Sequence, residues 1–184
     1  SSCVEGGLLG HGQVDIRPSH ESSIHRGIHR GPGQQSMVAP AVRQMSLLLP
    51  AGPAGTLEGL VNAKPAGGPR ALAVLGHPLP TAGGTMHTKA VFHAAKALAR
   101  IDVPVLRFNF RGVGRSAGSF SDGPGERDDC RAALAFMKAR YADVRRIWCG
   151  GMSFGSWVAL TVGAEDPGVT ALIGIACPVN KYDY

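Results

Sequence analysis

The chain has 184 residues, 44% hydrophobic and 17% charged, which excludes a disordered protein and leaves room for one domain with a sizeable core. Its formal net charge is +6, but the 19 Lys and Arg residues are scattered rather than gathered in a block, so we expect no nucleic-acid partner. No apolar run is long enough to span a bilayer and no signal-peptide pattern is visible, so we expect no membrane partner.

The four cysteines are Cys3, Cys130, Cys149 and Cys177, and no two of them have Cys-x-x-Cys spacing. This spacing argues against a zinc site or a redox motif. Cys149 and Cys177 stand in apolar runs, as buried free cysteines do. Free thiols in a core indicate a reducing compartment, so we expect a cytoplasmic protein.

Residues 1–44 are rich in Gly, Ser, His, Arg and Pro and show no apolar periodicity. We expect this segment to be a disordered leader or a non-native extension. His25 and His29 have the i, i+4 spacing with which a helix can hold a metal ion. Gly27 and Gly31 argue against a helix there, so we expect no metal site.

Residues 45–184 are expected to form the folded core. Short apolar runs predict strands over Leu57–Asn62 (at the sheet edge), Ala71–Gly76, Val103–Phe110, Arg145–Cys149 and Ala171–Ala176. Helical spacing of apolar residues predicts helices over His87–Arg100, Glu126–Tyr141 and Phe154–Glu165. This alternation predicts an α/β domain of three layers, α/β/α, with a mostly parallel sheet. The loops that follow the strands should then share one edge, where ligands bind in such sheets.

The motif Gly151-Met152-Ser153-Phe154-Gly155 reads G-x-S-x-G between a predicted strand and a predicted helix. This context is typical of a nucleophile elbow, whose tight turn strains the serine backbone and lifts its hydroxyl into the open. Ser153 is therefore the candidate nucleophile. The Phe154 N–H begins the helix and is the first candidate donor to an oxyanion.

A second oxyanion donor is expected from the loop after the Ala71–Gly76 strand, which reads His77-Pro78-Leu79-Pro80. Pro78 and Pro80 have no N–H, so Leu79 is the only donor between them. The two prolines should also stiffen the loop and fix the direction of that N–H.

From about residue 47 onward the chain resembles the α/β-hydrolase superfamily, and within it the small, lidless intracellular serine hydrolases with a His-Pro-x-Pro-x-x-Gly-Gly loop. Three segments carry the resemblance: His77–Met86, Arg107–Ser116 and Gly151–Gly155. It implies a hydrolase of small carboxylic esters or thioesters that works through an acyl-enzyme and needs no cofactor. It also implies that Ser153 is the nucleophile and that the N–H groups of Leu79 and Phe154 form the oxyanion hole.

In that family an acid and then a histidine follow the nucleophile, but the last histidine of this sequence is His93. Asp166 follows the elbow helix too closely to be the acid, and Asp183 is next to the last residue, with nothing after it to hold it in place. We therefore expect an α/β-hydrolase fold that is incomplete at its C-terminal end, holds the N-terminal two-thirds of the core and is inactive by itself. His77, His87 and His93 are not expected to replace the base, because the family geometry places it on the other side of the serine. His77 should instead shape its loop through side-chain hydrogen bonds.

Two other functions remain open. The chain could be a non-catalytic binding or scaffold protein that keeps the elbow as a structural turn and binds a partner, or a second copy, along an exposed sheet edge. It could also bind a nucleotide at Gly112–Gly118, with Arg115 facing a phosphate, although the G-x-G-x-x-x-G spacing departs from the dinucleotide pattern. We favour a tight turn there, with Asn109, Arg111 and Gly112 forming the floor of the site.

Acidic residues stand at the start of the second predicted helix. Their carboxylates are expected to cap the helix or to be solvated. They are Asp122, Glu126 and Asp128.

Overall fold

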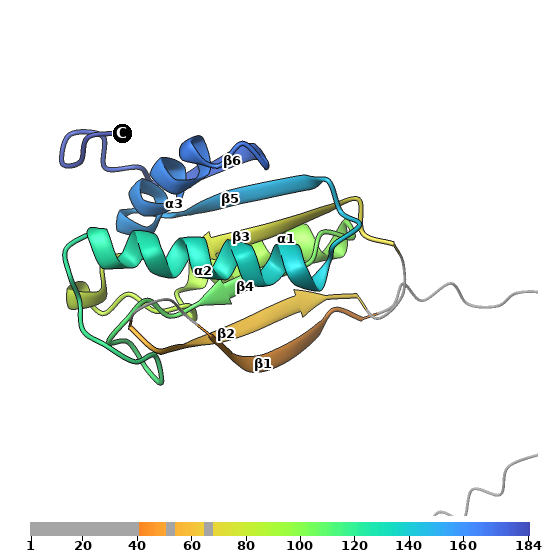
Figure 1. Cartoon of the computed structure of the whole chain (residues 1–184), viewed down its shortest axis with the longest axis horizontal. Coiled ribbons are helices and arrows are strands. Elements are labelled where there is room, and N and C mark those ends of the chain that lie inside the picture. The colour runs from red at the N-terminus through yellow and green to blue at the C-terminus, as the bar shows by residue number, and fades with distance from the viewer. Residues whose placement is uncertain (1–40, 51–53, 65–67) are drawn as a thin grey trace, which may run out of the picture. The chain divides into compact units, whose positions relative to one another are not determined.

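A computed structural model describes residues 41–50, 54–64 and 68–184 (Figure 1). Its strands are β1 (Arg43–Pro50), β2 (Thr56–Ala63), β3 (Ala71–Gly76), β4 (Val105–Phe108), β5 (Arg146–Met152) and β6 (Val169–Ile175). Its helices are α1 (Lys89–Arg100), α2 (Pro124–Arg140) and α3 (Phe154–Glu165), with a short 3-10 turn, η1 (Pro80–Ala82). The predicted leader lies outside the described residues except for residues 41–44, as do His25 and His29, and β1 begins within it at Arg43.

The strands form one sheet in the order β1-β2-β4-β3-β5-β6. β3, β4, β5 and β6 are parallel neighbours, whereas β2 is antiparallel to both β1 and β4. The predicted α/β class and mostly parallel sheet are confirmed. The predicted edge position of residues 57–62 is wrong, because β1 pairs with the outer side of β2 over the whole strand.

Apolar side chains fill the space on both faces of the sheet, because successive residues of a strand point to opposite faces. On one face, Leu106 and Phe108 of β4 join a core cluster with residues of α2 and α3. On the other face, Val105 of β4 packs in a second cluster with Val91 and Ala95 of α1. The helices therefore cover the two faces as separate layers, as predicted.

The carboxyl ends of the parallel strands meet at one edge of the sheet. Gly76 of β3 pairs with Gly151 of β5, and Leu75 of β3 pairs with Arg107 of β4. The loops that begin after Gly76, Phe108 and Met152 consequently leave the sheet side by side. The predicted common edge is confirmed, and all the candidate site residues lie on it or on the loops above it.

Candidate active site

Ser153 joins β5 to α3 with a backbone conformation that side-chain-bearing residues rarely adopt, φ 53° and ψ −121°. Three backbone contacts hold it. Its N–H donates to the Ile175 carbonyl at 2.9 Å, and its carbonyl accepts from the N–H of Ser156 at 2.9 Å and of Trp157 at 3.2 Å. Ser153 is half-buried rather than sunk in the core. The strained turn predicted from the G-x-S-x-G motif is thus present.

Both flanking glycines are required by close backbone packing. A Cβ on Gly151 would collide with the Gly155 carbonyl, and a Cβ on Gly155 would collide with the His77 carbonyl and lie 2.6 Å from the Gly76 carbonyl carbon. The first turn of α3 therefore rests directly on the end of β3 and on the loop that follows it.

This packing brings the two predicted oxyanion donors to the same corner of the site. Phe154 is the first residue of α3, where an N–H has no partner within the helix. In the described part of the chain, the Leu79 N–H donates no hydrogen bond, whereas the Leu79 carbonyl accepts from Ala82 at 3.1 Å and from Gly84 at 3.0 Å. The Leu79 side chain packs against the core cluster that contains Phe154.

His77 ties the Leu79 loop to the end of β4. Its Nδ1 lies 2.7 Å from the Pro78 carbonyl, and its Nε2 accepts from the Phe110 N–H at 3.1 Å. The ring is fully buried, and burial lowers its pKa from 6.5 to about 4. The predicted loop-shaping role is confirmed. The other two described histidines, His87 and His93, are both exposed. His93 lies on α1, which covers the sheet face opposite α3.

Asn109 connects the loops around the candidate site, and one of its partners is a residue that the sequence did not single out, Glu58 of β2. The Asn109 Oδ1 accepts from the Met86 N–H at 2.9 Å, and its Nδ2 donates to Glu58 Oε2 at 2.9 Å. The Asn109 carbonyl accepts from the Ser116 hydroxyl at 2.7 Å. Asn109 thus joins the loops after β3 and β4 to the neighbouring strand.

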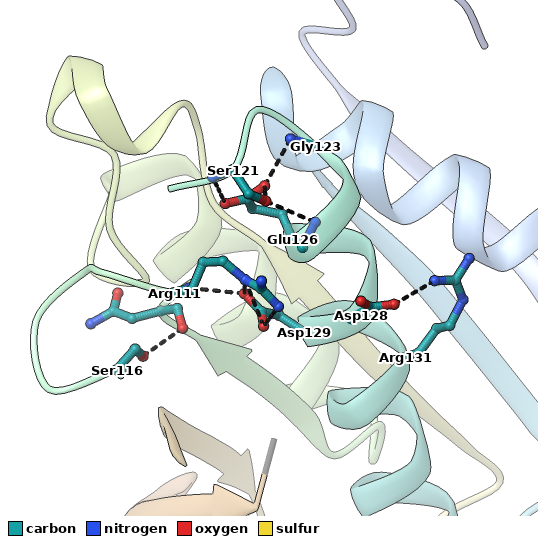
Figure 2. A network of polar contacts seen from close by, with 10 residues as sticks. Arg111, Ser116, Ser121, Gly123, Glu126, Asp128, Asp129 and Arg131 are labelled. Carbon is teal, nitrogen blue, oxygen red and sulfur yellow. Dashed lines mark hydrogen bonds and ion pairs between the residues drawn. The ribbon is translucent and has the colours of Figure 1, made fainter. Parts of the chain in front are cut away.

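An ion pair fixes the beginning of the loop after β4 (Figure 2). Arg111 Nη2 lies 2.8 Å from Asp129 Oδ1, and the Arg111 backbone N–H donates to Asp129 Oδ2 at 2.9 Å. The Asp129 side chain is 1% exposed, so this pair is buried on its acidic side. Asp129 was missed in the sequence, although its i, i+4 relation to the buried Ala133 places it on the apolar stripe of α2.

Glu126 caps the start of α2, as predicted, but it is fully buried rather than solvated (Figure 2). Its carboxylate accepts from the Ser121 N–H at 3.0 Å, the Ser121 hydroxyl at 2.9 Å and the Gly123 N–H at 2.8 Å. Asp122 is exposed, and Asp128 forms a surface pair with Arg131 at 2.9 Å. The expected mixture of one capping acid and solvated acids is therefore observed, with Glu126 as the cap.

The loop over residues 112–118 has contacts that suit a tight turn better than a phosphate site. Gly112 has φ 73° and its N–H donates to the Ala117 carbonyl at 3.1 Å. The Arg115 N–H already donates to the Glu58 carboxylate at 2.9 Å. This N–H is therefore already engaged, and no helix follows the loop directly, since α2 begins only at Pro124.

Two aspartates follow the elbow, and neither is placed to act as the acid by the contacts that the structure shows. Asp166 lies far from Ser153, and Asp183 is held through its backbone carbonyl. Asp166 follows the last residue of the 12-residue helix α3, and its Oδ2 pairs with Lys138 Nζ at 2.6 Å, which lowers the Asp166 pKa. A helix of this length separates Asp166 from Ser153 by about 18 Å, so it cannot be the acid, as expected. The expectation that nothing holds Asp183 is wrong, because its carbonyl accepts from Trp157 Nε1 at 2.6 Å.

Within the ranges that the structure describes, no three His, Cys, Asp or Glu side chains converge as metal ligands, and no helix is long and apolar enough to cross a bilayer. Cys130 of α2 and Cys149 of β5 are both buried and unbridged, with 3.8 Å between their sulfur atoms.

Comparisons with known proteins agree with this geometry. A family model described as serine aminopeptidase, S33, matches residues 69–183. An uncharacterized protein of Rickettsia prowazekii is 38% identical over 136 residues, which are 72% of this chain and 57% of the relative. An α/β serine hydrolase without a lid from Xanthomonas campestris is 40% identical with a TM-score of 0.70, covering 77% of this chain and 64% of that one.

A solved protein of unknown function from Agrobacterium tumefaciens is 32% identical with a TM-score of 0.71, covering 76% of this chain and 63% of that one. The chain thus spans between 57% and 64% of the length of these three relatives. On the fold, the elbow and the extent of these matches, the chain belongs to the α/β-hydrolase superfamily, within the family described as serine aminopeptidase, S33.

Proposed function

We propose that the protein is a serine hydrolase of small carboxylic esters or thioesters, with Ser153 as its nucleophile. The observation that carries this proposal is the conformation of Ser153, strained at φ 53° and half-buried at the sheet edge. Such strain persists only where the surrounding structure enforces it, and it is characteristic of functional sites. An ordinary structural turn between β5 and α3 has no need of a serine in this conformation.

In the proposed reaction, Ser153 Oγ attacks the carbonyl carbon of the ester and the alcohol or thiol leaves, which forms an acyl-enzyme that water then hydrolyses. The N–H groups of Leu79 and Phe154 donate to the oxyanion of each tetrahedral intermediate. Support for this role comes from their shared corner and from the absence of another described partner for the Leu79 N–H.

A base and an acid for Ser153 are proposed to come from residues outside these 184. The His77 imidazole is committed to Pro78 and Phe110, and no histidine follows His93 in the sequence. Without a base to take its proton, the Ser153 hydroxyl is a weak nucleophile. These 184 residues alone are therefore proposed to be inactive.

An ester substrate is preferred over a peptide with a free amino terminus, although the family description names an aminopeptidase. An α-ammonium group would need a free carboxylate near the elbow. Three of the described carboxylates around the site are already engaged, because Glu58 binds Asn109, Glu126 caps α2 and Asp129 pairs with Arg111. The Xanthomonas campestris relative is described as a serine hydrolase without a lid, and an open site of that kind suits small esters.

The experiment compares substrates with the protein expressed from its complete reading frame. We expect turnover of p-nitrophenyl acetate and butyrate, no turnover of aminoacyl p-nitroanilides, and loss of esterase activity in Ser153→Ala. Equal ester turnover by Ser153→Ala would overturn the nucleophile assignment. Preferred turnover of the anilides would overturn the substrate class.

A binding function is the second candidate, favoured by the outer edge of β6. Leu172 of β6 is 47% exposed and borders a groove of about 490 Å³ that is also lined by Leu160, Thr161 and Tyr184. An exposed apolar edge strand can pair with another chain, including a second copy. Sedimentation of the protein with and without Leu172→Asp tests this: a dimer that the substitution dissociates supports association, and a monomer in both cases excludes it.

We place the protein in the cytoplasm. Cys130 and Cys149 remain free thiols although their sulfur atoms are only 3.8 Å apart, as expected in a reducing compartment.

A further inference from the structure

We infer that His77 is a positioning residue that aims the Leu79 N–H at the oxyanion, an inference that rests on the proposed hydrolase function. The Pro78 carbonyl and the Leu79 N–H belong to the same peptide group. That group is planar and, because Leu79 is not a proline, trans, so its N–H points opposite to its carbonyl. By holding the Pro78 carbonyl at 2.7 Å, His77 Nδ1 fixes the direction of the Leu79 N–H.

The hydrogen-bond partners determine the tautomer of His77. The Phe110 backbone N–H can only donate, so the His77 Nε2 that it contacts at 3.1 Å must be the unprotonated acceptor. The proton of the neutral ring is therefore on Nδ1, and the contact with Pro78 is a true N–H···O=C hydrogen bond. A donor on the Pro78 carbonyl also polarises the peptide and strengthens the Leu79 N–H as a donor.

The surroundings leave this imidazole little freedom. Its ring is fully buried and lies 4.8 Å from the Phe110 ring, centroid to centroid. The next carbonyl along the chain, that of Leu79, is held by Ala82 and Gly84. The carbonyls of Pro78 and Leu79, which stand on either side of the Leu79 N–H, are thus both fixed. His77, anchored just after β4, holds the Pro78 carbonyl, and the Leu79 N–H is left free for a ligand.

Two substitutions separate aiming from general stability. His77→Asn keeps a donor near the place of Nδ1, whereas His77→Leu keeps the bulk and removes both hydrogen bonds. With the full-length protein and p-nitrophenyl butyrate, we expect His77→Leu to lower kcat by about 10- to 100-fold with KM changed less than about threefold, since losing a whole oxyanion donor costs about 100- to 1,000-fold. His77→Asn should recover most of kcat.

A boronic acid that forms a tetrahedral anion on Ser153 provides a second readout. Its affinity should fall with kcat in His77→Leu, because only the tetrahedral state uses the aimed N–H. Met137→Ala is the stability control, because Met137 is fully buried in α2 and lies away from the site. This substitution should destabilise the fold while leaving kcat unchanged.

The outcomes distinguish this inference from the proposed function. If a fluorophosphonate labels wild-type Ser153 but His77→Leu keeps the kcat and boronate affinity of Met137→Ala, the aiming role is overturned and the hydrolase stands. If His77→Asn is as impaired as His77→Leu, the donor to Pro78 is not what matters, which also overturns it. If wild-type Ser153 takes no label, the proposed function fails first and this inference fails with it.

Discussion

The Cα of Gly155, at the start of α3, packs against the His77 carbonyl at the end of β3 so closely that a Cβ on Gly155 would overlap the carbonyl oxygen. This contact sets the distance between the elbow and the Leu79 loop. Any side chain at position 155 must push the two apart, which links the geometry of the site to the stability of the fold.

Gly155→Ala is therefore expected to lower the free energy of unfolding by about 1–3 kcal/mol, the usual cost of overpacking. Gly68→Ala is the matched control, because a Cβ on Gly68 meets nothing within 4 Å. Urea denaturation followed by circular dichroism measures both. Equal stabilities of the two variants would show that the close approach of Gly155 to His77 is not rigid.

The positive φ of Ser153 predicts that glycine and alanine at this position have the opposite order of stability from that at ordinary positions. Glycine adopts φ 53° without strain and alanine does not, so Ser153→Gly should be more stable than Ser153→Ala by about 1 kcal/mol. At ordinary positions alanine is the more stabilising residue of the two. Thermal unfolding of both inactive variants gives the order, and a more stable Ser153→Ala would contradict the strained turn.

Asp129 and Asp128 are neighbours in α2 with different surroundings, which makes them a matched pair (Figure 2). Asp129→Asn leaves the Arg111 guanidinium without its buried counter-charge and should cost about 3 kcal/mol or more. Asp128→Asn removes a surface pair with Arg131, in which both side chains are about half exposed, and should cost less than about 1 kcal/mol. Similar losses in chemical denaturation would contradict the burial of the Arg111–Asp129 pair.

The lowered pKa of His77 makes stability depend on pH in a defined direction. The unfolded chain binds the proton near 6.5 and the folded chain near 4, so acid favours the unfolded chain. The contribution of neutral His77 should be complete above pH 6.5 and should fall by roughly 3 kcal/mol as the pH drops to about 4. His77→Asn should lack this part of the pH dependence. A wild-type pH profile that coincides in slope with that of His77→Asn would contradict the neutral, buried imidazole.

The parallel part of the sheet could be predicted from the sequence because β3, β4, β5 and β6 are short apolar runs that alternate with helical segments. β1 could not. It lies at the sheet edge with Met45 and Leu48 more than 40% exposed, so its residues carry no clear alternation between buried and exposed positions. What makes it a strand is its pairing with β2, which depends on the assembled sheet.

The elbow was predictable because its requirements are local: a strand, a helix and two glycines within five residues. The floor of the site was only partly predictable, because its contacts join distant segments. Asn109 meets Glu58 across 51 positions of the chain, and no local pattern marks Glu58 as its partner. Whether Asp128 or Asp129 is the buried aspartate depends on which side of α2 faces the core. The buried Ala133, one turn after Asp129, shows this side only when the apolar positions are followed along the whole helix.

The central claim is that the Ser153 hydroxyl is the nucleophile, and covalent labelling tests it most directly. The protein expressed from its complete reading frame is treated with a fluorophosphonate, digested and analysed by mass spectrometry. We expect a single adduct, on the peptide that contains Ser153, and none in Ser153→Ala. An adduct on another residue, or an unlabelled Ser153 in the folded full-length protein, would contradict the claim.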